Sequence, residues 1–510
     1  MAILSYPGVY VEEISSGVRP IEAASTSTAA FVGLTERGSD NEARRITSWT
    51  EFQKYYGTFI NDSYLAQSVF QYFNNGGRQC YIVRITCSDA EKAEVTAQNG
   101  ASPPADTLKF SAKDVGAWGN SVCLQIEKGT DDPKNEFKIS VRRQAIPGTM
   151  SDPELEKFLE APALEVHDNL SMDPSASNYV VKVLSRNSVF IKAEDLKATG
   201  SPVGLRPAEA KNIQLVNGAD GKETLNEQSY SAGFSYLDNK PDFSLLAVPG
   251  IGTSIMVDAG VAYCQKRPLQ DVFYIGEMAS GESTPDAAET FRKSLTQPNS
   301  YGAVYFPWIK ALDPSGKSPE PVLLPPSGFV AGLYARIDAK RGVWKAPAGT
   351  EATLSGAVGL AIELTDIEQG NLNRINVNCI RRFPAAGIVS WGARTITSNP
   401  EYKYVPVRRM AIMLRVSIYS GIQWAVFEPN DEDLWGQLRL NIRSFMMTLF
   451  RQGAFQGATP SQAFFVKCDS ETTTQDDINL GIVNVLVGFA SLKPAEFVVV
   501  KISQKAGQSS

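Results

Sequence analysis

Four short and almost uninterrupted apolar runs constrain the fold of this chain more than any other feature of its sequence. They are residues 29–34, 80–85, 242–250 and 271–275. A strand that is covered by helices on both faces loses the alternation of polar and apolar residues, so such runs are typical of a buried parallel sheet. A helix-like stretch at residues 63–74 ends on a Gly-Gly pair just before the second run. Helix, glycine stop and strand in this order predict an α/β layer.

Residues 106–225 differ from the segments on either side of them. Their strand candidates, such as residues 137–141, alternate polar with apolar side chains and lie between Pro, Asp, Asn and Gly residues. The buried runs resume afterwards, so we expect a strand-rich outer domain that is inserted into a middle α/β domain of residues 26–105 and 226–354. The chain of 510 residues is long enough for about three domains. The expected fold class is therefore α/β and α+β with several domains.

Charge and composition exclude several classes of function. The chain has 49 Lys and Arg against 55 Asp and Glu, a net charge of −6, which is too acidic for a protein that coats nucleic acid. It has no apolar run of the ~18 residues that cross a bilayer and no signal-peptide pattern, so we expect it to fold in the cytosol. Its six cysteines include no C-x-x-C pair and are expected to be buried apolar side chains in a reducing compartment.

Catalytic motifs are missing from the sequence. His167 is the one histidine, which excludes any site that needs two imidazoles. A Ser-His-Asp triad needs one histidine, but no G-x-S-x-G motif is found, and His167 lies in a polar, loop-like stretch where we expect a solvated side chain. The glycines of residues 217–222 lack phosphate-loop spacing and favour a turn. We therefore expect no catalytic residue, metal or cofactor.

The first 25 residues have the character of an arm. Residues 9–14 alternate as a strand would, and Pro7-Gly8 and the Gly and Pro of residues 17–20 interrupt the pattern on either side. About 25 extended residues reach ~80 Å, farther than the radius of one domain. The residues predicted to form the donated strand are Val9, Tyr10, Val11, Glu12 and Glu13.

The other end of the chain carries a second β-prone run, residues 496–502, followed by a short polar tail. An exposed strand of this kind can pair with a second chain, although an internal strand of the last domain is the alternative. The residues predicted to form this arm are Phe497, Val498, Val499, Val500 and Ile502.

Residues 433–451 form the clearest helix pattern in the chain. One face is apolar, with Leu434, Leu438, Ile442, Phe445 and Leu449 at intervals of three and four residues. The opposite face mixes two apolar and two basic side chains, which is unusual for a solvated surface. It is either a partly covered domain face or a contact surface for another chain, and its residues are Leu440, Arg443, Met447 and Arg451.

Nine short motifs of this sequence together resemble one family, the contractile tail sheath proteins of phages, of extracellular injection particles and of R-type bacteriocins. The motifs are YPGVYVEE at residues 6–13, NNGG at 74–77, WGN at 118–120, PPSG at 325–328, RGVWKAPAG at 341–349, WGART at 391–395, VRR at 407–409, FEPN at 427–430 and PAEF at 494–497. The segment from about residue 120 to 225 contributes little to the resemblance.

The resemblance implies a helical sleeve around a rigid inner tube that contracts to drive the tube through a target cell envelope. It implies an inner domain, residues 355–495, that faces the tube, and arms, residues 1–25 and 496–510, that add strands to the inner domains of neighbouring copies. It also places the helix at 433–451 nearest the tube, with Arg443 and Arg451 facing acidic groups.

The expected partners are further copies of the chain, the inner tube protein, baseplate proteins and terminator or cap proteins, with a sheath paralogue left open. No nucleic acid and no membrane insertion are expected. The particle would be assembled in a bacterial cytoplasm as a phage tail or a tail-like particle that can be released. Two alternatives stay open: another tail or baseplate subunit, or a surface-binding module, of the same particle. An enzyme carried on a tail is disfavoured by the missing motifs.

Overall fold

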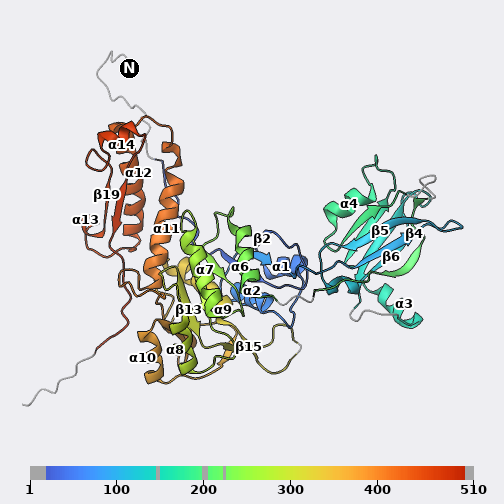
Figure 1. Cartoon of the computed structure of the whole chain (residues 1–510), viewed down its shortest axis with the longest axis horizontal. Coiled ribbons are helices and arrows are strands. Elements are labelled where there is room, and N and C mark those ends of the chain that lie inside the picture. The colour runs from blue at the N-terminus through green and yellow to red at the C-terminus, as the bar shows by residue number, and fades with distance from the viewer. Residues whose placement is uncertain (1–18, 145–149, 198–204, 222–224, 317, 500–510) are drawn as a thin grey trace, which may run out of the picture.

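The computed structural model describes residues 19–144, 150–197, 205–221, 225–316 and 318–499. It divides into three parts along its length: a central body, an outer module at one end and an end domain at the other (Figure 1). None of the helices in these ranges combines the length and the apolar composition that crossing a bilayer requires.

The body is built on an eight-stranded sheet in the order β18-β17-β13-β12-β11-β1-β3-β2. Six strands, from β17 to β3, are parallel, and the edge strands β18 and β2 are antiparallel to their neighbours. The predicted apolar runs are confirmed as central strands, and every residue of β1, β3, β11 and β12 is buried. The strands are β1 (Ala29–Gly33), β2 (Ala43–Ile46), β3 (Cys80–Arg84), β11 (Leu245–Ala247), β12 (Phe273–Glu277), β13 (Gly302–Phe306), β17 (Val377–Phe383) and β18 (Gly387–Ser390).

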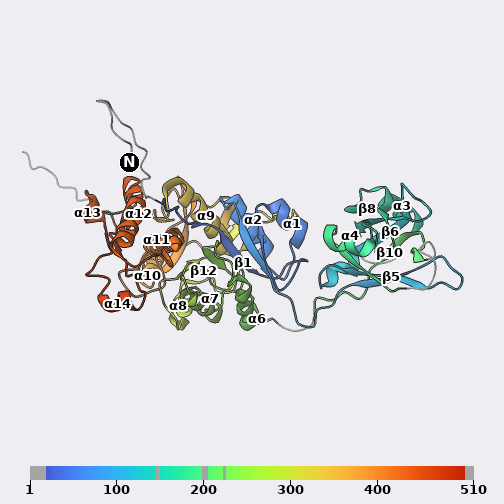
Figure 2. The same cartoon turned by 90° about the horizontal axis from the view of Figure 1, so that it is seen from above.

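Helices cover both faces of this sheet, with α2 and α9 on one side and α6, α7 and α8 on the other (Figure 2). Helix α2 packs closely on α9 because Gly328 has no side chain: a Cβ there would lie 2.4 Å from the carbonyl oxygen of Ser68. The helices of the body are α1 (Trp49–Tyr56), α2 (Leu65–Asn74), α6 (Glu227–Ala232), η2 (Gly233–Leu237), α7 (Ser254–Lys266), α8 (Pro285–Ser294), α9 (Pro326–Arg341) and α10 (Asp366–Arg374). A small sheet of β14 (Ile309–Ala311), β15 (Val322–Leu324) and β16 (Ala357–Leu360) packs beside α9.

The outer module, residues 91–219, leaves the body after β3 and returns to it before α6, and it has its own hydrophobic core. Two antiparallel sheets, β10-β6-β7-β8 and β4-β5-β9, form it. Its elements are β4 (Glu94–Gln98), β5 (Asp106–Ala112), η1 (Ala117–Ser121), β6 (Val122–Lys128), β7 (Phe137–Arg143), α3 (Asp152–Glu160), β8 (Glu165–Leu170), α4 (Val180–Asn187), β9 (Ile191–Asp195) and β10 (Ala210–Gln214).

The end domain, residues 405–490, is mostly helical and ends in a two-stranded sheet. Helix α11 joins it to the body, because Val405 and Ile412 lie in the core of the body while Met410 and Met413 lie in the core of the end domain. Its elements are α11 (Val405–Gly421), η3 (Gln423–Ala425), α12 (Glu432–Arg451), α13 (Pro460–Ala463), β19 (Phe464–Lys467), α14 (Gln475–Asn479) and β20 (Leu486–Phe489).

Two expectations about local structure have different outcomes. The helix predicted at 433–451 is found as α12, and all five residues of its apolar face are buried. His167 is not a solvated loop residue, because it lies in β8 with its side chain turned inward, 9% exposed, and its Nε2 3.1 Å from Glu165 Oε2. Its neighbours in the strand, Val166 and Asp168, are exposed, and the polar composition of the segment concealed the inward position of His167.

Three strands lie on the other side of an expected domain limit from the sheet to which they belong. Strand β4 already pairs with β5 of the outer module, although its residues precede the expected limit at 106. Strands β17 and β18 belong to the large sheet, although they follow the expected limit at 354. Polar residues on one face of β4 weaken its strand signal, and the partner of β17 lies about 70 residues earlier in the chain. The division into domains of a sheath subunit stays a prediction.

Candidate assembly site in the end domain

The last sheet of the chain has only two strands. Strands β19 and β20 are antiparallel, with Phe464 opposite Phe489 and Lys467 opposite Leu486. Within the residues that the structure describes, neither strand has a further strand partner, so each keeps one open edge. Two-stranded sheets are only marginally stable in water unless something packs on them. Here Phe464 supplies that packing, since it is buried in the core formed by α11 and α12.

The other face of this sheet is apolar and exposed. Phe465 and Leu486 are each 53% exposed. The Phe465 ring lies across the strand partner Gly488, where a Cβ would stand 2.2 Å from the ring. Open edges and exposed apolar side chains together are the features that allow a sheet to accept an additional strand.

After β20 the chain leaves the end domain and crosses to the body, where Glu496 is held. Arg394 donates to it through Nε at 2.7 Å and Nη2 at 2.6 Å, and the Tyr404 hydroxyl donates at 3.1 Å. The side chains of Arg394 and Glu496 are 7% and 18% exposed. Burial disfavours the charged carboxylate, but the hydrogen bonds and charge of Arg394 outweigh it and hold the pKa of Glu496 below its ordinary value.

The predicted C-terminal arm begins directly after this ion pair. Phe497, Val498 and Val499 are 75%, 82% and 79% exposed and belong to no strand of the described chain. Val500 and Ile502 lie outside the described residues. In Figure 1 the dark red segment runs down from the end domain toward α10, away from the sheet of its own subunit.

The chain preceding the body is fastened along α11 and α12. Ile21 is buried in the core of the end domain, and the backbone N–H of Ala24 donates to Ser417 Oγ at 2.9 Å. The backbone N–H of Arg19 donates to Asn441 Oδ1 at 2.9 Å, and its guanidinium lies 4.4 Å from the Trp424 ring centroid. The predicted strand residues Val9, Tyr10, Val11, Glu12 and Glu13 lie outside the described residues.

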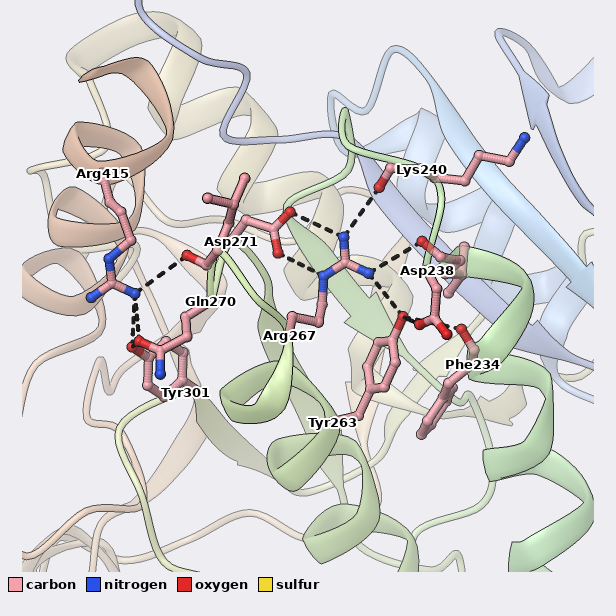
Figure 3. Close-up of polar contacts among 11 residues, drawn as sticks. Phe234, Asp238, Lys240, Tyr263, Arg267, Gln270, Asp271, Tyr301 and Arg415 are labelled. Carbon is pink, nitrogen blue, oxygen red and sulfur yellow. Dashed lines mark hydrogen bonds and ion pairs between the residues drawn. The ribbon is translucent and has the colours of Figure 1, made fainter. Parts of the chain in front are cut away.

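Buried charges fix α11, and with it the end domain, to the body. Arg409 pairs with Asp338 of α9 at 2.5 Å, with side-chain exposures of 3% and 7%. Figure 3 shows a second contact, in which Arg415 of α11 donates to Gln270 Oε1 at 2.6 Å and to the Tyr301 hydroxyl at 3.2 Å. These contacts hold the end domain in place on the body.

The loop that receives Arg415 is itself held by a buried ion pair. Arg267 donates to both carboxylate oxygens of Asp271, at 2.6 and 3.0 Å, and to the Tyr263 hydroxyl at 2.9 Å (Figure 3). The Asp271 carboxylate and its hydrogen bonds raise the pKa of Arg267 despite its burial, so the guanidinium stays charged.

The mixed face predicted on α12 lies opposite its buried face, although Met447 also packs against the core of the end domain. Leu440 is 46% exposed, Arg443 and Arg451 are exposed, and Met447 is half-buried. Within the described chain neither arginine has a hydrogen-bond or ion-pair partner. The structure thus brings these four residues onto one helix face, and their role stays a prediction.

Sequence reasoning missed the two-stranded sheet and the Arg394–Glu496 pair. The apolar stretches of β19 and β20 are each four residues long, and 18 residues separate them, so no hairpin signal connects them. Both members of the ion pair belong to motifs that carried the family resemblance, but 102 residues separate them. Among the described residues, no group of three or more His, Cys, Asp or Glu side chains is arranged to hold a metal ion.

A three-part α/β chain that carries a two-stranded sheet with an exposed apolar face, and an exposed β-prone segment at residues 497–499, has the features of a structural subunit that assembles. Comparison with known families gives the particular one: the model of the phage tail sheath protein central domain matches residues 211–396, and that of the phage tail sheath C-terminal domain matches residues 397–505. The chain belongs to the contractile tail sheath family, and it is a structural subunit of a contractile, phage-tail-like sheath.

Individual relatives agree with this assignment. A putative prophage major tail sheath protein of Pseudomonas aeruginosa (strain UCBPP-PA14) is 25% identical over 324 residues, which cover 61% of this chain and 79% of that protein. The sheath of the extracellular contractile injection system PVC in its contracted state is 25% identical, with a TM-score of 0.59 and 99% of both chains covered. The contracted helical sheath of the anti-feeding prophage shares the fold, at 22% identity, a TM-score of 0.59 and 99% and 100% coverage.

Proposed function

We propose that copies of this chain polymerise helically around an inner tube, joined by strands that each copy donates to its neighbours, and that the sleeve contracts to drive the tube through a target envelope. The unfinished β19–β20 sheet is the observation that carries this proposal. Residues 9–13 and 497–502 are the donated strands. The sheet that accepts them is β19–β20 of another copy.

The C-terminal strand is better suited to a neighbour than to its own sheet. Glu496 is bound to Arg394 of the body, so Phe497 starts from the body and not from β20. Donation forms several backbone hydrogen bonds, each worth a net ~1 kcal/mol. It also buries Val and Phe surface that now faces solvent, at about 25 cal/mol per Å². Repeated along a sleeve, such links persist while weaker contacts between faces exchange during contraction.

The remaining partners follow from the same arrangement. The exposed face of α12, with Leu440, Arg443, Met447 and Arg451, is the surface that contacts the inner tube. Similar chains are found in a baseplate and in a contracted sheath of the anti-feeding prophage, and we propose baseplate and terminator proteins as partners of this chain at the ends of the sleeve. The chain acts as a structural part with no catalytic role, is made and assembled in a bacterial cytoplasm, and belongs to a phage tail or a released particle.

Val499→Pro tests the donated strand. Proline removes a backbone donor and clashes within a ladder, so we expect a folded, soluble protein that forms no sleeves under the electron microscope. Gln508→Pro, in the polar tail beyond the predicted strand, is the matched control and should assemble normally. Normal sleeves from Val499→Pro would contradict donation of this strand.

A further inference from the structure

The end domain carries an exposed apolar tip next to the start of α12. Phe427 is 102% exposed, and its backbone φ of 71° is a left-handed conformation that bulky residues rarely adopt. Val426 and Leu480 beside it are 58% and 74% exposed. The Asn430 side chain donates to the carbonyl of Ile482 at 3.0 Å, which ties the two loops of the tip together. A large aromatic ring held out in a strained conformation indicates a contact with another molecule.

Acidic residues surround this tip. Glu428, Asp431, Glu432 and Asp433 follow Phe427 within six positions, and all of them are exposed. The Asp431 carboxylate caps α12 by accepting from the Leu434 N–H at 2.9 Å. The matching surface of a partner must therefore combine aromatic side chains with positive charge.

A groove lined by aromatic and basic side chains lies at the other end of α12. It has a volume of about 1040 Å³, and Gln452, which directly follows α12, lines it. Trp344 and Trp391 provide aromatic surface, and Arg374 and Lys345 provide positive charge. Within the described chain the Arg374 guanidinium has no hydrogen-bond or ion-pair partner, and Lys345 donates only to the carbonyl of Ala346.

The tip and the groove lie at opposite ends of α12: the tip belongs to the end domain, whereas body residues such as Trp344 and Trp391 form much of the groove. Helix α12 has 20 residues and so separates them by ~30 Å. In Figure 1, α14 marks the tip end and α10, whose Gln369 lines the groove, lies at the opposite end. A head-to-tail contact between two different patches of the same chain forms a ring if its rotation closes and an open helical array if it does not.

We propose that the tip of one copy, residues 426–433 with Leu480 and Ile482, docks into the Trp344–Trp391 groove of a second copy. In this contact the Phe427 ring is buried between the indole rings of the groove. The acidic residues that follow it form ion pairs with Arg374 and Lys345. This inference rests on the proposed self-assembly and adds a face-to-face contact beside the base of the C-terminal segment, since residues 492–497 line the groove. The contact is the kind that can break and reform while the strand links persist.

Cysteine cross-linking tests the contact directly in the full-length chain. Phe427→Cys combined with Gln369→Cys places one thiol on the tip and one at the groove, and a short bis-maleimide should convert assembled protein into a ladder of covalent oligomers. Each single variant is the control and should give no ladder. Sleeves that form without a ladder, or a cross-link from position 427 to the tube protein instead, would overturn the inference and leave the proposed function intact.

Phe427→Asn measures the contribution of the ring. Asparagine tolerates the left-handed conformation, so folding is expected to be unchanged, which circular dichroism would verify. We expect the protein concentration needed for sleeves to rise about tenfold, as for a central aromatic contact. Ile255→Asn, an exposed apolar residue of α7 (62% exposed), is the matched control. An unchanged concentration for Phe427→Asn would overturn the inference, whereas failure of the wild-type chain to polymerise would refute the proposed function itself.

Discussion

The sheet of the body and the sheet of the end domain have similar β-prone residues but very different burial. All five residues of β1 are buried, whereas one of the four residues of β19 and none of β20 is. The large sheet is stabilised within one chain, because helices cover both of its faces. The small sheet is covered on one face only, by the core of the end domain. The comparison teaches that one chain can hold a region whose stability is internal and a region whose stability is completed by assembly.

The largest difference is expected when the same substitution is made in both sheets. Phe31→Ala in β1 removes a ring that is fully buried and should lower the free energy of unfolding by about 3–5 kcal/mol. Phe465→Ala in β19 removes a ring that is half exposed and should cost the isolated subunit less than about 1 kcal/mol, yet it should impair sleeve formation. Urea denaturation and electron microscopy measure the two effects. Equal losses of stability would contradict the division into a sheet that is stabilised within the chain and an unfinished sheet.

A pH dependence in which stability is lost on raising the pH should arise in the body. Burial at the end of β12 raises the pKa of Glu277 to about 7, although its carboxylate accepts from the backbone N–H groups of Gly250 at 2.5 Å and Ser327 at 3.0 Å. The folded protein therefore retains a proton that the unfolded chain, with the ordinary value of 4.5, releases. The stabilisation is present below about pH 4.5, and it is lost as the pH rises through 7.

Glu277→Gln isolates this effect, since the amide mimics the protonated carboxyl at every pH. Between pH 5 and 7.5 the wild-type protein should lose about 2–3 kcal/mol of unfolding free energy relative to the variant. Denaturant titrations of both proteins at several pH values provide the measurement. Parallel pH profiles would show that Glu277 does not carry the proton.

A smaller effect is expected where the C-terminal segment meets the body. Glu496→Gln removes the charge that pairs with Arg394 and should cost about 1–2 kcal/mol locally, because a charge-assisted bidentate contact is lost. Acid should have the same effect as this substitution, because the pKa of Glu496 is lowered in the folded protein. The stabilisation from the contact is present above the ordinary pKa of a glutamate and is lost as the pH falls below it, which is the opposite direction to Glu277. Limited proteolysis after residue 490 should become faster, with global stability almost unchanged. Glu351→Gln, which breaks an exposed pair with Arg341, is the control.

The sequence predicted the body better than the end domain, and the reason is physical. Apolar runs such as residues 80–85 mark buried strands by composition alone, and the 3.6-residue period of α12 needs no knowledge of its neighbours. Both signals are local. The α/β fold class and the central strands could therefore be predicted and are confirmed.

The features of the assembly site depend on distant partners and could not be predicted in the same way. The pairing of Arg394 with Glu496 is set by how the C-terminal segment crosses the body, and the pairing of β19 with β20 by their common packing on α12. The prediction of a solvated His167 was wrong for a related reason. Its burial is decided by the neighbouring strand β7 and not by its polar surroundings in the sequence. The arms were predicted as β-prone ends, and the sheet that we propose as their acceptor, β19–β20, was not predicted.

The smallest effect on stability should come from the exposed face of α12, where the comparison between the regions is sharpest. Arg443→Glu with Arg451→Glu reverses two charges that have no partner in the described chain, so the free energy of unfolding should change by less than about 0.5 kcal/mol. If this face contacts an acidic tube, the double variant should still form sleeves but should not bind tube protein in co-sedimentation, and wild-type binding should weaken with added salt. Lys54→Glu, on a helix of the body far from α12 in Figure 1, changes charge in the same direction and should leave tube binding intact. Normal binding by the double variant would mean that another surface of the end domain faces the tube.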